Sequence, residues 1–159
     1  MKKWIWIIVI VCFIIIGFTV NIYLNAVKPV KAASAKAETI AEKEAELKNV
    51  DKFSLVHGTD KNTYYIVEGT NNKNENIIVW IEEKKHTVTV KNKKDGMTKK
   101  EAINTLLEKR SPSKINTVRL SMIKGIPAWE INTHSDNNLT NYYYLDFETG
   151  ELLLNIENI

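Results

Sequence analysis

The chain has 159 residues, a formal net charge of +3 and one cysteine, Cys12. A single cysteine excludes a disulfide within the chain and a zinc site built on several cysteines, so an exported domain here has to rely on packing alone. Lysine outnumbers arginine twenty to two. Because bidentate readout of phosphates and bases favours arginine, we expect no nucleic-acid ligand.

The first predicted element is an apolar helix over residues 4–24, WIWIIVIVCFIIIGFTVNIYL, which contains no charged residue. As a helix this segment spans about 31 Å, close to the hydrocarbon thickness of a bilayer. Lys2 and Lys3 precede it, so the positive-inside rule places the N-terminus in the cytoplasm. The sequence therefore predicts a single-pass protein of the cell membrane that contacts lipid through residues 4–24 and holds its C-terminal domains on the extracytoplasmic side.

A cleaved signal peptide is the alternative for this segment. The apolar run is longer than the roughly 7–15 residues of a signal-peptide core. The one cleavage-like site, Ala33-Ser34-Ala35, lies well beyond the end of the run. We therefore expect an uncleaved signal anchor over residues 1–25.

A juxtamembrane linker is predicted over residues 26–32, where Pro29 is expected to break the helix. Beyond the linker, apolar residues recur mainly at spacings of three and four, with Lys and Glu between them. This pattern predicts an amphipathic helix that ends near Asn49. Its apolar face is mostly alanine, so whatever packs on this helix has to approach closely.

Four strand-like segments follow, rich in β-branched and aromatic residues and separated by polar turns. They cover residues 52–58, 63–70, 77–83 and 86–92. The last two are close enough in sequence to form a hairpin, so these segments predict a small antiparallel sheet.

The second half of the chain repeats this order of elements. TKKE at 98–101 has the pattern of a capping box, in which Thr98 and Glu101 satisfy each other's backbone amides at the start of a helix. Ser111-Pro112 ends that helix. Four further strands are predicted over residues 116–123, 127–134, 141–147 and 151–157.

The two halves also match at a nearly constant offset. YIVE at 65–68 lies 64 residues before WEIN at 129–132, and IIVWIEEKKHTVTV lies 65 residues before YYYLDFETGELLLN. We interpret this as an internal duplication of one unit. The predicted fold is α+β: a transmembrane helix followed by two units, residues 33–95 and 96–159, each a helix packed on a small antiparallel sheet.

Charge is polarised along the predicted outer part of the chain. Residues 84–124 carry a net charge of +9, from 12 basic and 3 acidic residues, whereas residues 125–159 carry 6 acidic residues and no Lys or Arg. A lysine-rich stretch of this kind is most often a solvated sheet edge. It is also suited to contact with anionic headgroups or anionic cell-wall polymers.

Sequence motifs for catalysis or metal binding are missing. His57, His86 and His134 each stand alone on a predicted strand or strand end. No metalloprotease, serine-hydrolase or Gly-rich phosphate-binding motif occurs. We expect structural or solvated histidines, no bound metal, no cofactor and no small-molecule substrate.

Asp146, Glu148 and Glu151 form the candidate acidic site. Side chains alternate along a strand, so Asp146 and Glu148 could point the same way, as an acid–base pair or a cation site needs. An Asp shortly before a Thr-Gly pair is, however, typical of a hairpin turn. The first unit has IEEKKHTV at the matching place, without the Asp or the Thr-Gly. This excludes a site shared by both units and favours the turn, so no catalytic residue is assigned.

Most aromatic side chains are expected between sheet and helix. One or two are expected on an exposed face, where Tyr and Trp favour contacts with other proteins. The candidates for such partner contacts are Tyr65, Trp80, Trp129 and Tyr143.

The sequence YYYLDFETGELL at 142–153 resembles the C-terminal hairpin of PepSY-type domains. The TKKEAI start of the second helix and the GIPAWEI strand fit the same arrangement, as does a degenerate first copy behind a Lys-Lys-led anchor. Over essentially its whole length, the chain is similar to the TseB-like (YpmB) family of cell-wall elongation regulators of low-GC Gram-positive bacteria.

The resemblance implies a membrane-anchored extracytoplasmic protein that is not an enzyme. Relatives in that family act with a class B penicillin-binding protein during peptidoglycan synthesis, which makes such a protein the expected partner. The PepSY resemblance also implies an alternative, an inhibitor or regulator of an extracytoplasmic peptidase. The family defines no catalytic residues, so none is carried over.

Overall fold

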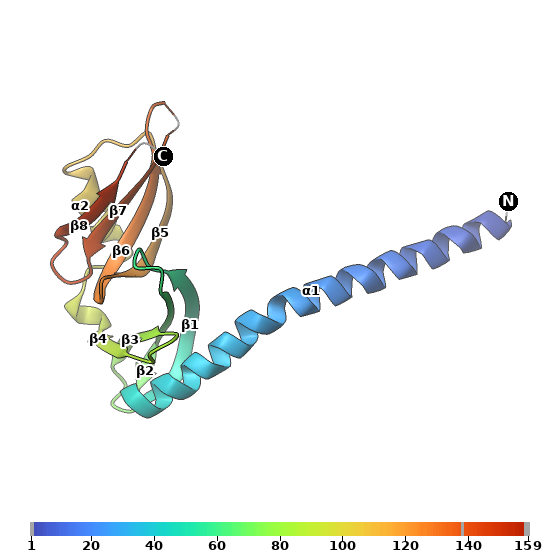
Figure 1. Cartoon of the computed structure of the whole chain (residues 1–159), viewed down its shortest axis with the longest axis horizontal. Coiled ribbons are helices and arrows are strands. Elements are labelled where there is room, and N and C mark those ends of the chain that lie inside the picture. The colour runs from blue at the N-terminus through green and yellow to red at the C-terminus, as the bar shows by residue number, and fades with distance from the viewer. Residues whose placement is uncertain (1, 138, 158–159) are drawn as a thin grey trace. The chain divides into compact units, whose positions relative to one another are not determined.

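The computed structural model describes residues 2–137 and 139–157, with side chains from residue 10 onward. It confirms the α+β class: a long helix precedes two antiparallel four-stranded sheets, with a short helix before the second sheet (Figure 1). The chain divides into two compact units, one ending at Lys36 and one beginning at Ala37. Each is described by itself.

Helix α1 (Lys2–Ala45) joins the apolar segment and the predicted amphipathic helix into one element. The break predicted at Pro29 is therefore wrong, because residues 26–32 are helical. A proline in a helix interior removes one backbone hydrogen bond and favours a kink, but helix-forming residues on both sides can carry the helix through it. The division of the chain into domains at residues 25, 32 and 95 stays a prediction.

The end of α1 comes four residues before the predicted one. Glu46 adopts a left-handed backbone conformation, with a φ of 52°, and this is a common way for a helix to end. The chain enters the first strand at Leu47.

The apolar part of α1 is exposed along its described length. Every side chain from Ile10 to Leu24 is exposed. By length and composition this helix is sufficient to cross a membrane. Such a large apolar surface is unusual on a soluble protein and marks a site of contact with lipid or protein.

The first sheet is an antiparallel meander whose four strands are neighbours in chain order. They are β1 (Leu47–His57), β2 (Thr63–Asn71), β3 (Asn76–Glu82) and β4 (Val88–Asn92). A short 3-10 turn, η1 (Lys93–Asp95), leads to the second half. All four predicted strands are thereby confirmed, with ends shifted by a few residues.

The second half begins with helix α2 (Lys99–Leu107). The predicted capping box is present: the Thr98 hydroxyl accepts from the Glu101 amide, and the Glu101 carboxylate accepts from the Thr98 amide at 2.7 Å. A second four-stranded meander follows, formed by β5 (Lys114–Ile123), β6 (Ile126–His134), β7 (Thr140–Asp146) and β8 (Leu152–Ile156).

The strand register confirms the internal duplication. Tyr64 pairs with Glu82 between β2 and β3, and Ala128 pairs with Asp146 between β6 and β7. Ala128 lies 64 positions after Tyr64, and Asp146 lies 64 positions after Glu82. The outer strands β1 and β5 correspond at an offset of 65, since Ser54 faces Ile66 and Arg119 faces Glu130.

Each sheet has one face that carries a helix. In the second copy, Ala102 and Leu106 of α2 form a buried cluster with Ile131, Tyr143 and Leu145. In the first copy, Ala37 and Ala41 in the last turns of α1 are fully buried. This agrees with the expectation that the alanine stripe of that helix is closely packed.

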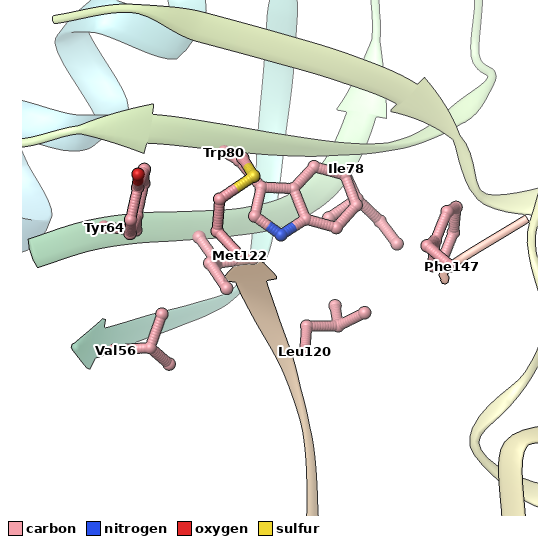
Figure 2. Packing of buried hydrophobic residues seen from close by; sticks show 8 residues of the cluster. Val56, Tyr64, Ile78, Trp80, Leu120, Met122 and Phe147 are labelled. Carbon is pink, nitrogen blue, oxygen red and sulfur yellow. The ribbon is translucent and has the colours of Figure 1, made fainter. Parts of the chain in front are cut away.

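The two copies share one hydrophobic core (Figure 2). It combines residues of β1, β2 and β3 with β5 and the residue after β7, and its buried members are Val56, Tyr64, Ile66, Ile78, Trp80, Leu120, Met122 and Phe147. Figure 2 shows the Trp80 indole among Met122, Leu120 and Phe147. The indole N–H donates to the Ser121 carbonyl at 3.0 Å, and the ring meets Phe147 edge-on at 5.4 Å.

Candidate functional site

The helix-free faces of the two sheets have different surroundings. In the first copy, this face carries Ile66 and Trp80, which are buried in the shared core. The corresponding positions of the second copy are Glu130 and Tyr144, which pair across β6 and β7. We call the second of these surfaces the open face and define it by one set of residues: Arg119, Ser121, Ile123, Ala128, Glu130, Tyr142, Tyr144, Leu153 and Leu154.

A buried ion pair lies at the centre of the open face. Glu130 is 2% exposed, and both Nε and Nη2 of Arg119 contact its Oε1, at 2.8 and 2.6 Å. The Ser121 hydroxyl donates to Oε2 at 3.4 Å. A carboxylate held by two guanidinium nitrogens is a geometrically defined, charge-assisted contact. The Arg119 side chain is half exposed, so its guanidinium covers the buried carboxylate of Glu130.

Tyr144 borders the same ion pair. Burial, together with the negative charge of Glu130, raises the pKa of Tyr144 to about 12. The phenol therefore stays protonated throughout the physiological range. A hydrogen bond also links its hydroxyl to Glu130.

The remainder of the open face is apolar, with a buried centre and a half-buried margin. Ile123, Ala128 and Tyr144 form a buried cluster against which Tyr142, Leu153 and Leu154 pack, and all of these residues belong to the sheet itself. Tyr142, Leu153 and Leu154 are half-buried. A sheet face with a central ion pair and an apolar margin is compatible with a protein contact, in which aromatic and aliphatic groups give the affinity.

The four predicted contact aromatics lie elsewhere. Trp80 is fully buried in the shared core, and Tyr65 and Tyr143 are 3% and 4% exposed. Trp129 is partly buried between the clusters, and its indole N–H donates to the Met97 carbonyl at 3.0 Å. The structure thus gives these rings packing roles. A partner contact through them stays a prediction, and for Trp80 it would require the shared core to open.

The hydroxyls of the two buried tyrosines reach acidic partners. Tyr65 donates to Glu83 at 2.7 Å, and burial together with this hydrogen bond raises the pKa of Tyr65 to about 12. Burial, with a hydrogen bond to Glu157, also raises the pKa of Tyr143. Both phenols are therefore stabilised in the protonated form, which suits tyrosines that are packed and hydrogen-bonded.

The acidic hairpin of the second copy is a turn. Asp146 Oδ1 accepts from the amides of Glu148 and Thr149 at 2.9 and 2.7 Å, and from the Thr149 hydroxyl at 3.0 Å. Gly150 has a φ of 72°, in the left-handed region. One oxygen of Asp146 is thus occupied by its own turn, as the turn interpretation predicts. Glu148 and Glu151 are exposed.

The histidines are distributed among separate strand ends and turns. His57 and His134 contact threonine hydroxyls across their hairpins, at 3.2 Å to Thr63 and 3.5 Å to Thr140. His86 lies in the β3–β4 turn with a φ of 56°. Among the described residues, no three His, Cys, Asp or Glu side chains are grouped as metal ligands.

A cleft of about 250 Å³ lies where the two copies meet. Glu68 in it accepts from Lys52 and Lys93, each at 3.1 Å. Burial raises the pKa of Glu68, but the two lysine hydrogen bonds and their charges outweigh burial and hold this pKa below its usual value. Glu68 is therefore a stable anion enclosed by cations.

Sequence reasoning missed Arg119, Glu130 and Glu68 as a possible basis for function. A signal for Glu130 was present: at the offset of 64, it corresponds to Ile66 of the first copy. A charged residue at a position that is apolar and buried in the other copy indicates a local difference in surroundings. The partners of Glu68 come from η1 and β1, so they could not be assigned without the fold.

Two family models match the chain. The cell wall elongation regulator TseB-like domain matches residues 36–82, and the peptidase propeptide and YPEB domain, PepSY, matches residues 96–154. The two matches cover most of the first and second copies in turn.

Relatives support the same relationship. The chain is 29% identical over 137 residues to the "Probable cell wall elongation regulator TseB" of Bacillus subtilis (strain 168), a match that covers 86% of this chain and 84% of that protein. It is also similar to the solved structure of the YpmB protein from Bacillus subtilis, with a TM-score of 0.70 and 30% sequence identity over 80% of this chain and 95% of that one.

Proposed function

Because the chain belongs to the TseB/YpmB-like family of cell-wall elongation regulators, we propose that it regulates peptidoglycan elongation from the outer face of the cell membrane. In this proposal the protein acts by binding another protein and catalyses no reaction itself. Helix α1 is its single membrane anchor, with the N-terminus in the cytoplasm and both PepSY-like copies outside.

The observation that carries this proposal is the exposed apolar length of α1. Side chains from Ile10 to Leu24 are exposed, and a helix of this length and composition can span a bilayer. Lys2 and Lys3 precede it, which supports the proposed orientation. Anchoring confines the two sheets to a thin layer above the membrane, which raises their effective concentration toward another membrane protein.

The proposed partner is a class B penicillin-binding protein, and the proposed contact is the open face. Support comes from its half-buried Tyr142, Leu153 and Leu154, whose cluster consists of residues of the sheet alone. The buried Arg119–Glu130 pair would give such a contact a fixed polar centre.

Site-specific photo-crosslinking in living cells tests the proposal. A photoreactive amino acid is placed at Leu153 on the open face and, as the matched control, at Lys73 in the β2–β3 turn, which is also accessible. We expect the penicillin-binding protein to be crosslinked from position 153 and not from position 73. Equal yields from both positions, or no envelope protein from position 153, would contradict the open face as the contact.

The anchor is tested separately by complementation. A soluble exported version without residues 1–25 is expected to fail to restore elongation, whereas a version with an unrelated transmembrane helix is expected to restore it. Full activity of the soluble version would contradict the role of the membrane.

A second candidate function is control of an extracytoplasmic peptidase. It is favoured by one observation: residues 96–154 match a family model described as peptidase propeptide and YPEB domain. In that case the intact protein in detergent micelles would slow a purified envelope peptidase, and the Leu153→Lys variant would report whether the open face is used. An unchanged peptidase rate at saturating protein would contradict control of a peptidase and would leave regulation of elongation as the remaining proposal.

A further inference from the structure

The cleft between the two copies has a net positive charge at its rim and an apolar floor. Its lining includes the cations Lys52, Lys93, Lys99 and Arg119, and Glu68 is its acidic member. Arg119 pairs with Glu130, which is outside the cleft. The lysines Lys52, Lys93 and Lys99 against Glu68 leave a local charge of +2.

The floor of the cleft is formed by the edge of the shared core. Phe147 and Ile78 of that core, together with Trp129 and Met97, line the cleft. Pockets that bind small molecules combine mostly apolar walls with a few placed polar groups. At about 250 Å³, the cleft is slightly below the usual range of about 300–1,000 Å³ and suits a group the size of one amino acid.

Glu68 indicates that the lysines of the cleft bind a carboxylate. Lys52 Nζ contacts its Oε1 and Lys93 Nζ contacts its Oε2, each at 3.1 Å. A lysine ammonium has three donor hydrogens, so these two contacts leave further donors on both. The side chains of Lys52 and Lys93 are 65% and 56% exposed, whereas Glu68 is 14% exposed. The lysines therefore form a rim above a carboxylate that is already enclosed.

We propose that this cleft binds the C-terminal carboxylate of a short peptide whose last side chain is apolar. The carboxylate lies among Lys52, Lys93 and Lys99, and the apolar side chain lies on Trp129 and Met97, which are partly exposed apolar residues of the lining. A phosphate group is less suited, because the charge is presented by flexible lysines around an internal carboxylate and the one arginine in the lining is already paired. This inference goes beyond the proposed function and does not depend on the anchor or on the open face.

The experiment uses the full chain in detergent micelles with ¹⁵N-labelled tryptophan. The Trp129 indole N–H, which donates to the Met97 carbonyl at the cleft, is the reporter. The probe is N-acetyl-alanyl-leucine with a free carboxylate, and its C-terminal carboxamide has the same shape without the charge. We expect a saturable shift of the Trp129 resonance with the carboxylate and at least tenfold weaker binding of the carboxamide, since a charge-assisted contact is lost.

Three variants distinguish the proposal from general attraction to a basic surface. Lys93→Gln is expected to weaken binding about fivefold to tenfold, because one cation of the rim is removed. Lys84→Gln is the matched control: Lys84 is an exposed lysine in the β3–β4 turn, outside the cleft lining, and its loss is expected to leave binding within about twofold, as for a screened distant charge.

Glu68→Gln gives the sharpest outcome because its expected sign is opposite. Removing the internal carboxylate frees Lys52 and Lys93, so the probe is expected to bind several-fold more tightly. Weaker binding to this variant, in protein whose thermal unfolding shows it to be folded, would overturn the proposal. Equal binding of the carboxamide, equal binding of phenyl phosphate, or an equal loss in Lys84→Gln would overturn it as well. Failure of the crosslinking test would leave these results unaffected.

Discussion

The two copies have the same strand order and matching register, yet their helix-free faces differ in environment and in chemistry. In the first copy, this face carries Ile66 and Trp80 and is buried against the second copy. In the second copy, Glu130 and Tyr144 occupy the same positions, and the cluster there consists of sheet residues alone. One copy thus uses its face for internal packing, and the other retains a polar centre with an apolar margin.

This difference follows from the ordinary cost of exposed apolar surface. A duplicated unit has two such faces, and packing one of them against the neighbouring copy buries the large side chains it carries. Among the described residues, the hydrophobic cluster on the remaining face draws only on its own sheet. It carries an ion pair and partly exposed tyrosine and leucine, a composition that stays soluble and is suited to a partner.

The largest expected effect comes from truncating Trp80, a large side chain on the buried face of the first copy. Trp80→Ala is expected to lower the free energy of unfolding by about 3–5 kcal/mol, because it leaves a cavity in the core shared by both copies and removes the hydrogen bond to Ser121. The corresponding change on the open face, Tyr144→Ala, is expected to cost less, about 2 kcal/mol, because Tyr144 is buried in a smaller cluster of its own sheet whose margin is only half-buried.

Urea unfolding of the full chain in detergent micelles, followed by far-ultraviolet circular dichroism, measures both variants. Trp80→Phe is the control and is expected to retain most of the stability, since an aromatic ring remains beside Phe147. Equal losses for Trp80→Ala and Tyr144→Ala would show that the two faces are packed alike and would remove the basis of the comparison.

The next effect concerns the ion pair at the centre of the open face. Arg119→Met is expected to cost about 2–3 kcal/mol, because Glu130 would keep a buried charge without its cation. The double variant Arg119→Met/Glu130→Ile is expected to recover most of that loss, because it replaces the pair by apolar groups, with isoleucine at the position that Ile66 holds in the first copy. A double variant that is as unstable as the single one would mean that the pair is needed for folding.

Much of this fold could be predicted from the sequence because its signals are local. The strands follow from runs of β-branched and aromatic residues, and α2 follows from the Thr98–Glu101 capping box. Asp146 was correctly interpreted as a turn residue because Thr149 and Gly150 follow it within hydrogen-bonding reach. Signals of this kind depend on residues that are close to each other in the sequence, so they can be interpreted without knowledge of the tertiary fold.

The surfaces could not be predicted to the same extent. Trp80 meets Ser121 41 residues away, and Lys93 reaches Glu68 across 25 residues. Nothing local to Trp80 indicates that its face is covered by another unit. Pro29 misled in the opposite direction, because a local helix breaker was overruled by the helix-forming residues around it. Long-range packing decides these features, and a single sequence does not display it.

A smaller effect is expected in the hairpin turns, where the two copies have different residues at a position with positive φ. Gly150 and His86 are 64 positions apart, and both have positive φ, 72° and 56°. Gly150→Ala is expected to cost about 1–2 kcal/mol, because a β-carbon is strained in this region and would approach Met97 Sδ to 2.9 Å. His86→Gly is expected to change stability by about 0.5 kcal/mol in the favourable direction, since relief of strain exceeds the added chain entropy.

Thermal unfolding of both turn variants in the same micelles checks this pair. The expected signs are opposite, so a common effect of sample or detergent cannot imitate the result. Destabilisation by His86→Gly would indicate that the imidazole makes a contact that outweighs the strain of its backbone.

The smallest effect is a pH dependence that the first copy has at Glu68 and the second lacks, because Asn132 occupies the matching position there. The lysine contacts hold the folded-state pKa of Glu68 below its unfolded value. Folding therefore gains this stability at pH values above the unfolded pKa and loses it as the pH falls through the folded one. The gain is modest, because Lys52 and Lys93 are more than half exposed and water screens their charges.

The measurement is the difference in unfolding free energy between the native chain and Glu68→Gln, followed from pH 7 to pH 3. The difference is expected to favour the native chain at pH 7 and to shrink toward pH 3, and 1 M sodium chloride is expected to reduce it at pH 7. If the difference stays constant over this range, Glu68 contributes by packing alone. The charge of the cleft would then be no part of what distinguishes the first copy from the second.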